Sequence, residues 1–74
     1  MDDWIFNDIE QYAYLKAKEG RTDVAFIGDK WRWHGYVPGS WAAMMDMDGE
    51  WGVCLTREEA QQSAEDYLRR YGAL

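Results

Sequence analysis

A single cysteine and a single histidine in 74 residues constrain what this chain can fold into. Cys54 has no partner for a disulfide, and together with His34 it falls short of the four ligands of a structural zinc site. A domain of this size buries only about 60% of its unfolded surface, so without such a cross-link it needs large core side chains. Twelve aromatic residues, five of them tryptophan, meet that need. The composition predicts one small globular domain over residues 1–74 and excludes a disordered chain.

The sequence carries no signal for a membrane or for export. No apolar run approaches the roughly 20 residues that span a bilayer, and the Met1-Asp2-Asp3 start lacks the basic region of a signal peptide. We therefore expect a cytoplasmic protein that has no membrane partner.

Three turn signals divide the middle of the chain: Gly28-Asp29, Pro38-Gly39 and Asp48-Gly49. They predict strands near residues 23–27, 30–37, 40–47 and 50–55, joined as an antiparallel meander. Two-residue hairpins at the three turns place one apolar set on one face: Val24, Phe26, Trp31, Trp33, Val37, Ala42, Met44, Trp51, Val53 and Leu55. The agreement of three independent registers supports the meander. However, Pro38-Gly39 favours a type II turn, whose twist suits a tight hairpin poorly.

Helices are predicted on both sides of this sheet. Asn7 and Glu10 have the spacing of a capping box, and the stripe that follows predicts a helix over residues 8–19: Ile9, Tyr12, Ala13 and Ala17. Whether Trp4, Ile5 and Phe6 extend that helix or precede it as an extended segment stays open.

The second helix has the stronger signals. Thr56 and Glu59 form a second capping box, Gly72 ends the helix, and one stripe is apolar: Ala60, Ala64, Tyr67, Leu68 and Tyr71. Glu65–Arg69 and Asp66–Arg70 are i,i+4 pairs in the favourable order. The predicted architecture is α+β in the order αββββα, with both helices packed on one face of a four-stranded antiparallel sheet.

The other face of the predicted sheet mixes polar and apolar residues: Asp23, Ala25, Ile27, Lys30, Arg32, His34, Tyr36, Trp41, Ala43, Met45, Met47, Glu50, Gly52 and Cys54. An apolar fraction of this size is typical of a contact surface. One interpretation is a docking or dimerisation surface formed by Tyr36, Trp41, Met45 and Met47. The alternatives are that the segment around Trp4 covers these residues, or that the third strand is out of register.

The sequence predicts no catalytic set, cofactor or metal site. In the predicted sheet Ala43 separates His34 from Cys54 by two strand spacings, about 10 Å, which is too far for a catalytic dyad. The run from Asp46 through Asp48 to Glu50 departs from a calcium loop, with Trp51 at its sixth position and Arg57 at its twelfth. A weak Mg²⁺ or Ca²⁺ contact stays open there, and we expect a protein that is not an enzyme.

Charge gives the positive signal for function. Eight basic residues against fourteen acidic ones leave a net charge of -6, which opposes direct nucleic-acid binding. Five acids group around the last hairpin and the start of the helix that follows: Asp46, Asp48, Glu50, Glu58 and Glu59. Such a group complements a basic groove on a protein partner. Ordinary solubility accounts for the same net charge.

A very small, acidic, aromatic-rich α+β domain without a catalytic set resembles the small inhibitors of phages and mobile elements, among them anti-CRISPR proteins. The likeness lies in residues 30–37 and in residues 50–55 running into residues 56–60, as architecture and composition without a shared motif. It implies a non-enzymatic inhibitor in a bacterial host's cytoplasm, which mimics DNA and blocks target-DNA binding by a CRISPR effector complex. We expect a monomer or weak homodimer. The alternative is a small accessory module that dimerises or docks through the exposed sheet face.

Overall fold

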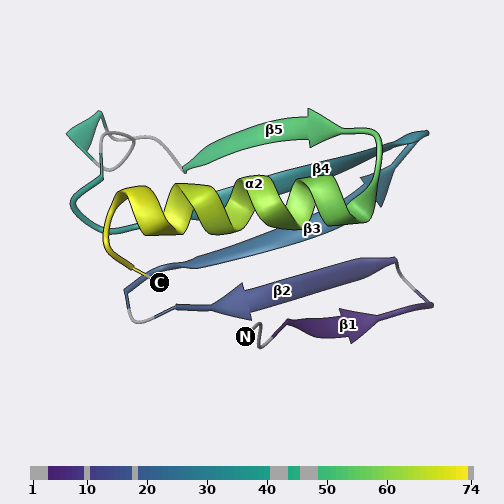
Figure 1. Cartoon of the computed structure of the whole chain (residues 1–74), viewed down its shortest axis with the longest axis horizontal. Coiled ribbons are helices and arrows are strands. Elements are labelled where there is room, and N and C mark those ends of the chain that lie inside the picture. Colours follow the sequence, from purple (N-terminus) through teal and green to yellow (C-terminus); the bar gives the residue numbers. More distant parts are fainter. Residues whose placement is uncertain (1–3, 10, 18, 41–43, 46–48, 74) are drawn as a thin grey trace.

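The computed structural model describes residues 4–9, 11–17, 19–40, 44–45 and 49–73. Its strands are β1 (Ile5–Asn7), β2 (Tyr12–Lys16), β3 (Arg21–Ile27), β4 (Lys30–Tyr36) and β5 (Glu50–Cys54), and α2 (Arg57–Arg70) follows them. The five strands form one antiparallel sheet in chain order, and α2 lies across one face of it (Figure 1). The α+β class is confirmed. The expected four strands and two helices are wrong in detail, because the sheet has five strands and one C-terminal helix packs on it.

The N-terminal segment is a β-hairpin, so the helix predicted over residues 8–19 is wrong. Ile5 pairs with Tyr14, which also shows that residues 5–7 are extended. Ala13 and Leu15 are buried while Tyr14 and Lys16 are exposed, which is the two-residue alternation of a strand. The expected helical stripe included Ile9, which is 96% exposed, and left out Leu15, which is 3% exposed. Burial of alternate residues against the sheet therefore outweighed the local helical signal.

The hairpin of β3 and β4 has the predicted register. Phe26 pairs with Trp31 and Val24 with Trp33 across the turn at Gly28 and Asp29. This register places Val24 and Trp33 on the face beneath α2, as expected. Val24 is fully buried there, and Trp33 packs against the core.

The predicted third strand over residues 40–47 is wrong, because β4 pairs directly with β5. Ser40 N donates to Val37 O at 3.0 Å, and Gly39 has φ +84°, so the chain turns tightly at Pro38-Gly39. Met44 N then donates to Ser40 O at 3.0 Å, which is a helical spacing. The turn therefore leads into a helical turn at Met44 instead of a strand. Residues 41–43 and 46–48 lie outside the described residues.

Without that strand, β5 presents the opposite face from the one predicted. Gly52 pairs with Trp33 and Cys54 with Trp31, so both lie on the helix side. Gly52 suits this register because a Cβ there would stand 2.5 Å from Trp33 Nε1. Trp51 and Val53, which were expected in the core, point to the other side and are 64% and 53% exposed. Three more residues of the predicted apolar set, Phe26, Met44 and Leu55, are also exposed, and Ala42 lies outside the described residues.

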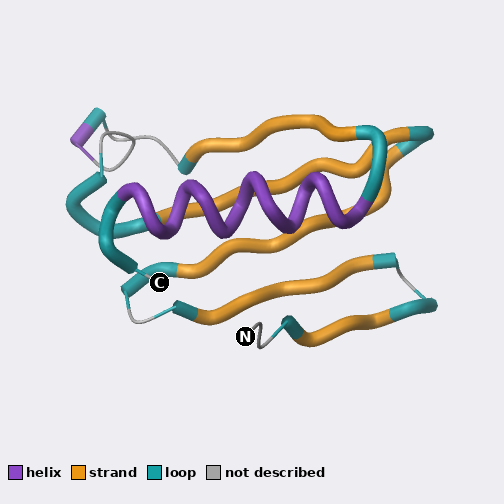
Figure 2. Tube along the Cα trace, in the orientation of Figure 1, coloured by secondary structure: helices purple, strands orange, loops and turns teal. Residues whose placement is uncertain are grey.

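Helix α2 forms as its capping box predicts and supplies four of the ten buried core residues. Thr56 Oγ1 accepts a hydrogen bond from Glu59 N at 3.1 Å, and Gly72 has φ +69° just after the last turn. The buried core joins both layers: Trp4, Ala13, Leu15, Val24, Val37, Ala60, Ala64, Tyr67, Leu68 and Ala73. Figure 2 shows the helix lying along the strands on this side. Among the residues that the structure describes, no helix is long and apolar enough to cross a membrane.

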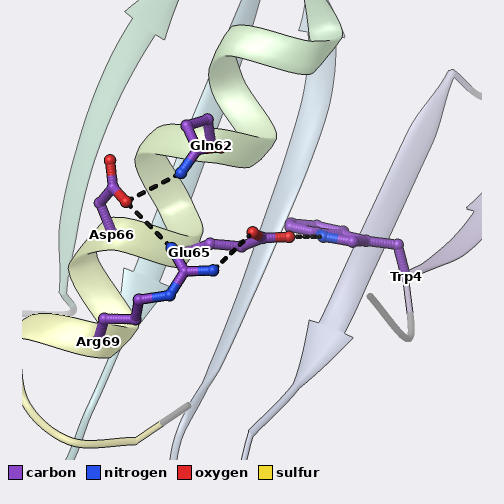
Figure 3. A network of polar contacts seen from close by, with 5 residues as sticks. All are labelled: Trp4, Gln62, Glu65, Asp66 and Arg69. Atoms are coloured by element: carbon purple, nitrogen blue, oxygen red, sulfur yellow. Dashed lines mark hydrogen bonds and ion pairs between the residues drawn. The ribbon is translucent and has the colours of Figure 1, made fainter. Parts of the chain in front are cut away.

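A polar network ties the N-terminal segment to α2 (Figure 3). Trp4 Nε1 donates to the buried Glu65 Oε2 at 2.7 Å, and Arg69 contacts Glu65 Oε1 at 3.3 Å. Arg69 also pairs with Asp66 at 3.1 Å. The predicted Glu65–Arg69 pair is therefore confirmed, whereas the expected partner of Asp66 was Arg70. Because Trp4 reaches the helix, it does not cover the other face of the sheet.

Candidate functional site

The sheet face opposite α2, called here the open face, is covered by no described helix or strand. Cross-strand pairing assigns fifteen residues to it: Ile5, Asn7, Tyr12, Tyr14, Lys16, Arg21, Asp23, Ala25, Ile27, Lys30, Arg32, His34, Tyr36, Trp51 and Val53. Seven of these, from Asp23 to Tyr36, were predicted on this face from the hairpin of β3 and β4. The others come from β1, β2 and β5, where the sequence predictions differ from the structure.

Large apolar side chains stand exposed at both edges of the open face. Trp51 and Val53 on β5 are 64% and 53% exposed, and Ile5 on β1 is 53% exposed. Ile27, at the end of β3, is 52% exposed. Small soluble proteins seldom expose apolar residues in such numbers on one face unless that face makes contacts. The combination of tryptophan, tyrosine and arginine is also the one that dominates binding energy at protein interfaces.

The open face is basic although the whole chain is acidic. Its residues include Lys16, Arg21, Lys30 and Arg32, four of the eight basic residues, whereas Asp23 is its only acid among the residues that the structure describes. Lys30 pairs with Asp29 at 3.3 Å. Within the described residues, no carboxylate lies within ion-pair distance of the other three cations. Charge is therefore separated between the open face and the remainder of the protein.

A hollow of about 350 Å³ lies on the open face where β2 meets β3. It is lined by Tyr12, Tyr14, Lys16 and Arg21, and the centroids of the two tyrosine rings are 6.2 Å apart. Burial raises the pKa of the Tyr12 phenol, and the neighbouring Asp23 carboxylate raises it further and shares a hydrogen bond with it. Asp23, the one described acid on the open face, is thus engaged by Tyr12. Two aromatic walls and two cations are the groups that surround the hollow.

The three residues of the predicted acidic site that the structure describes do not form one group, because Glu50 lies apart from Glu58 and Glu59. Glu50 lies on the helix side of β5, where its carboxylate is 3.8 Å from Arg70 Nη1 and accepts a hydrogen bond from Tyr71 at 3.5 Å. Glu58 and Glu59 stand at the other end of α2, in its first turn. Glu59 is held by its bonds to Thr56, and Glu58 lies 3.9 Å from Arg57. Asp46 and Asp48 lie outside the described residues.

The predicted apolar site is brought together only in part. Tyr36 lies on the open face as expected, at the end of β4. Met45 is 57% exposed but follows the helical turn and belongs to no strand. Trp41 and Met47 lie outside the described residues. On the open face Tyr36 is accompanied by Tyr12, Tyr14 and Trp51, which were not predicted there.

The described residues assemble no arrangement typical of a catalytic or metal site. His34 is on the open face, whereas Cys54 is on the helix side with its Sγ 3.7 Å from Ser63 Oγ. No group of three His, Cys, Asp or Glu side chains within the described ranges could hold a metal ion. A second hollow, of about 470 Å³, lies between β5 and α2 near Cys54, Glu59 and Ser63, and is open to solvent.

No family model, curated protein or solved structure matches this chain.

One sequence signal points to the residues that the predictions missed. From Tyr12 to Lys16, aromatic or charged residues alternate with the apolar Ala13 and Leu15, which is a strand pattern with two different faces. That pattern places Tyr12, Tyr14 and Lys16 together on one side. For Trp51 no such local signal exists, because its face depends on which strand pairs with β5.

Proposed function

We propose that this protein is a non-enzymatic binding module whose recognition surface is the open face of the sheet. The observation that supports this most is a sheet face that no described helix or strand covers, with Trp51, Val53 and Ile5 exposed on it. It also carries two arginines that pair with no carboxylate of the described residues. Large aromatic and arginine side chains on a rigid sheet lose little conformational entropy on binding and bury much surface. A five-stranded sheet backed by a helix holds them in fixed positions.

The test compares two double variants, each of which replaces two exposed apolar side chains with serine. One pair lies on the open face and the other lies elsewhere. Trp51→Ser with Val53→Ser alters the open face, and Met44→Ser with Leu55→Ser removes similarly exposed apolar residues elsewhere. Each protein is immobilised and exposed to an extract of the cells that make it. The wild type and the Met44/Leu55 variant should retain the same species. We expect the amount of each that the Trp51/Val53 variant retains to be lower by at least about tenfold. Equal retention by all three proteins would refute the proposal.

A second copy of this chain could itself be the partner that binds the open face, and this is tested separately. Sedimentation velocity at rising protein concentration reports whether a second copy is the partner. In that case the wild type and the Met44/Leu55 variant sediment faster as concentration rises, and the Trp51/Val53 variant remains a monomer.

The acidic inhibitor that mimics DNA is a competing candidate and stays a prediction. The charge separation favours it in one respect, since Asp23 is the only acid on the open face among the residues that the structure describes. Plaque counting on bacteria whose CRISPR system targets the infecting phage tests it. Expression of this protein should restore plaques, and Glu58→Lys with Glu59→Lys should abolish the restoration. No restoration across several CRISPR types would reject it.

A further inference from the structure

The hollow between Tyr12, Tyr14, Lys16 and Arg21 combines groups that suit one class of ligand. Its two phenol rings are tilted by 36° and lie 6.2 Å apart, so they offer flat apolar surface. Lys16 and Arg21 are exposed cations at its edge, and the one nearby acid, Asp23, is engaged with Tyr12. Aromatic surface beside unpaired cations favours a planar ring that carries a negative charge. A nucleotide, with its base and phosphate, has both parts.

We propose that the open face binds single-stranded nucleic acid, with one base stacked at Tyr14 and the backbone phosphates on Arg21, Lys16 and Arg32. This inference rests on the proposed function and names the partner of the same surface. Proteins that bind single strands combine aromatic stacking positions with a basic track for the backbone. Sheet faces with exposed aromatic residues serve this purpose for RNA, because unstacked bases lie flat on them.

The spread of the cations favours a chain over a free nucleotide. Lys16 lies opposite Arg21, but Arg32 lies four residues along β4 from Tyr36, the partner of Arg21, which is about 13 Å, so no single phosphate contacts all three. Trp51 lies on β5, three strand spacings or about 14 Å from Tyr14 across the sheet. It offers a second stacking position for a later base. The aromatic and basic side chains together follow a path across the strands.

The net charge of -6 would oppose nucleic-acid binding if the charges were spread evenly over the protein surface. Salt at physiological strength screens charges beyond about 8 Å, so a bound strand responds chiefly to the side chains that it touches. On the open face those are four cations and one acid. The sequence-based expectation of no direct nucleic-acid contact stays a prediction, and this proposal opposes it.

The experiment measures fluorescence anisotropy of a labelled oligothymidylate titrated with the intact protein at several salt concentrations. We expect saturable binding at low salt. Tyr14→Ala should weaken it by about tenfold or more through lost stacking, while Tyr14→Phe should keep most of the affinity. Arg21→Ala should weaken binding and lower the slope of log affinity against log salt by about 0.7, the value for one phosphate contact.

Arg70→Ala is the matched control. It removes the same charge as Arg21→Ala from an exposed arginine that lies beside Glu50 on the helix side, and it should leave affinity and salt slope unchanged. Circular dichroism of each variant checks that the fold is kept. Equal losses from Arg21→Ala and Arg70→Ala would show a general charge effect and overturn the proposal.

Three further outcomes would also overturn it. One is no saturable binding of the oligonucleotide at low salt. Another is equal binding of polyglutamate with no loss from Tyr14→Ala, which would indicate an acidic protein surface instead. The third is binding of thymidine monophosphate as tight as that of the oligonucleotide, which would indicate a free nucleotide. If one of these outcomes occurs while the Trp51/Val53 variant still loses its retained species, the binding module stands and only this choice of partner fails.

Discussion

Replacing Tyr67 with alanine is expected to lower the free energy of unfolding by about 3–5 kcal/mol, the usual cost of emptying a buried aromatic site. Tyr67 is fully buried between sheet and helix. Its ring centroid is 5.6 Å from that of Trp33 and 5.3 Å from that of Tyr71, so the substitution also removes two aromatic contacts. Since small domains unfold with about 5–15 kcal/mol, most of the stability is expected to disappear.

Urea unfolding followed by circular dichroism measures this loss. Tyr67→Phe is the control, because it keeps the ring and removes only the hydroxyl that donates to Ser40 Oγ at 3.4 Å. We expect that control to cost about 1 kcal/mol. If Tyr67→Ala and Tyr67→Phe lower the free energy of unfolding by the same amount, packing of the Tyr67 ring does not stabilise the core as predicted.

A methyl group added at Gly35 is expected to cost about 1–3 kcal/mol, the second-largest effect we predict. Gly35 lies on β4 beneath Tyr67, and a Cβ there would stand 2.7 Å from Tyr67 Cδ2. In an open strand, alanine is better than glycine by about 0.5–1 kcal/mol. Strand preference alone would make Gly35→Ala stabilising, whereas the contact with Tyr67 is expected to make it destabilising.

The double variant Gly35→Ala with Tyr67→Ala separates the two effects. In the Tyr67→Ala protein the space above Gly35 is empty, so the added methyl group should cost little or stabilise. A double-mutant cycle from urea unfolding gives the coupling. Equal costs of Gly35→Ala in both backgrounds would contradict the close fit of Gly35 and Tyr67. Where Tyr67→Ala alone is too unstable, Tyr67→Leu takes its place in the cycle.

The sequence predicted the elements whose signals are local. Thr56, Glu59 and Gly72 mark the ends of α2 by capping chemistry, and the turn at Gly28-Asp29 sets the register of β3 and β4. Each of these depends on residues that are close in the chain. For the same reason, seven of the fifteen open-face residues were predicted from β3 and β4 alone.

The remaining elements depend on contacts between distant residues. Over residues 8–19 helix and strand patterns overlap, and only burial of Leu15 against the sheet decides between them. The face of Trp51 depends on whether β5 pairs with β4 or with another strand, and a change of one residue in register reverses every side chain. The candidate site was missed at those two places, so its aromatic residues Tyr12, Tyr14 and Trp51 came only from the structure.

The position of α2 has a consequence for how the chain folds during translation. The helix follows all five strands in the chain, and the hydrogen bond from Trp4 to Glu65 joins residues 61 positions apart. A nascent chain that has released only its strands from the ribosome has both sheet faces in water, with Ala13, Leu15 and Val24 uncovered. Such partly emerged sheets are prone to aggregate. Stable folding is therefore expected only after α2 has left the exit tunnel.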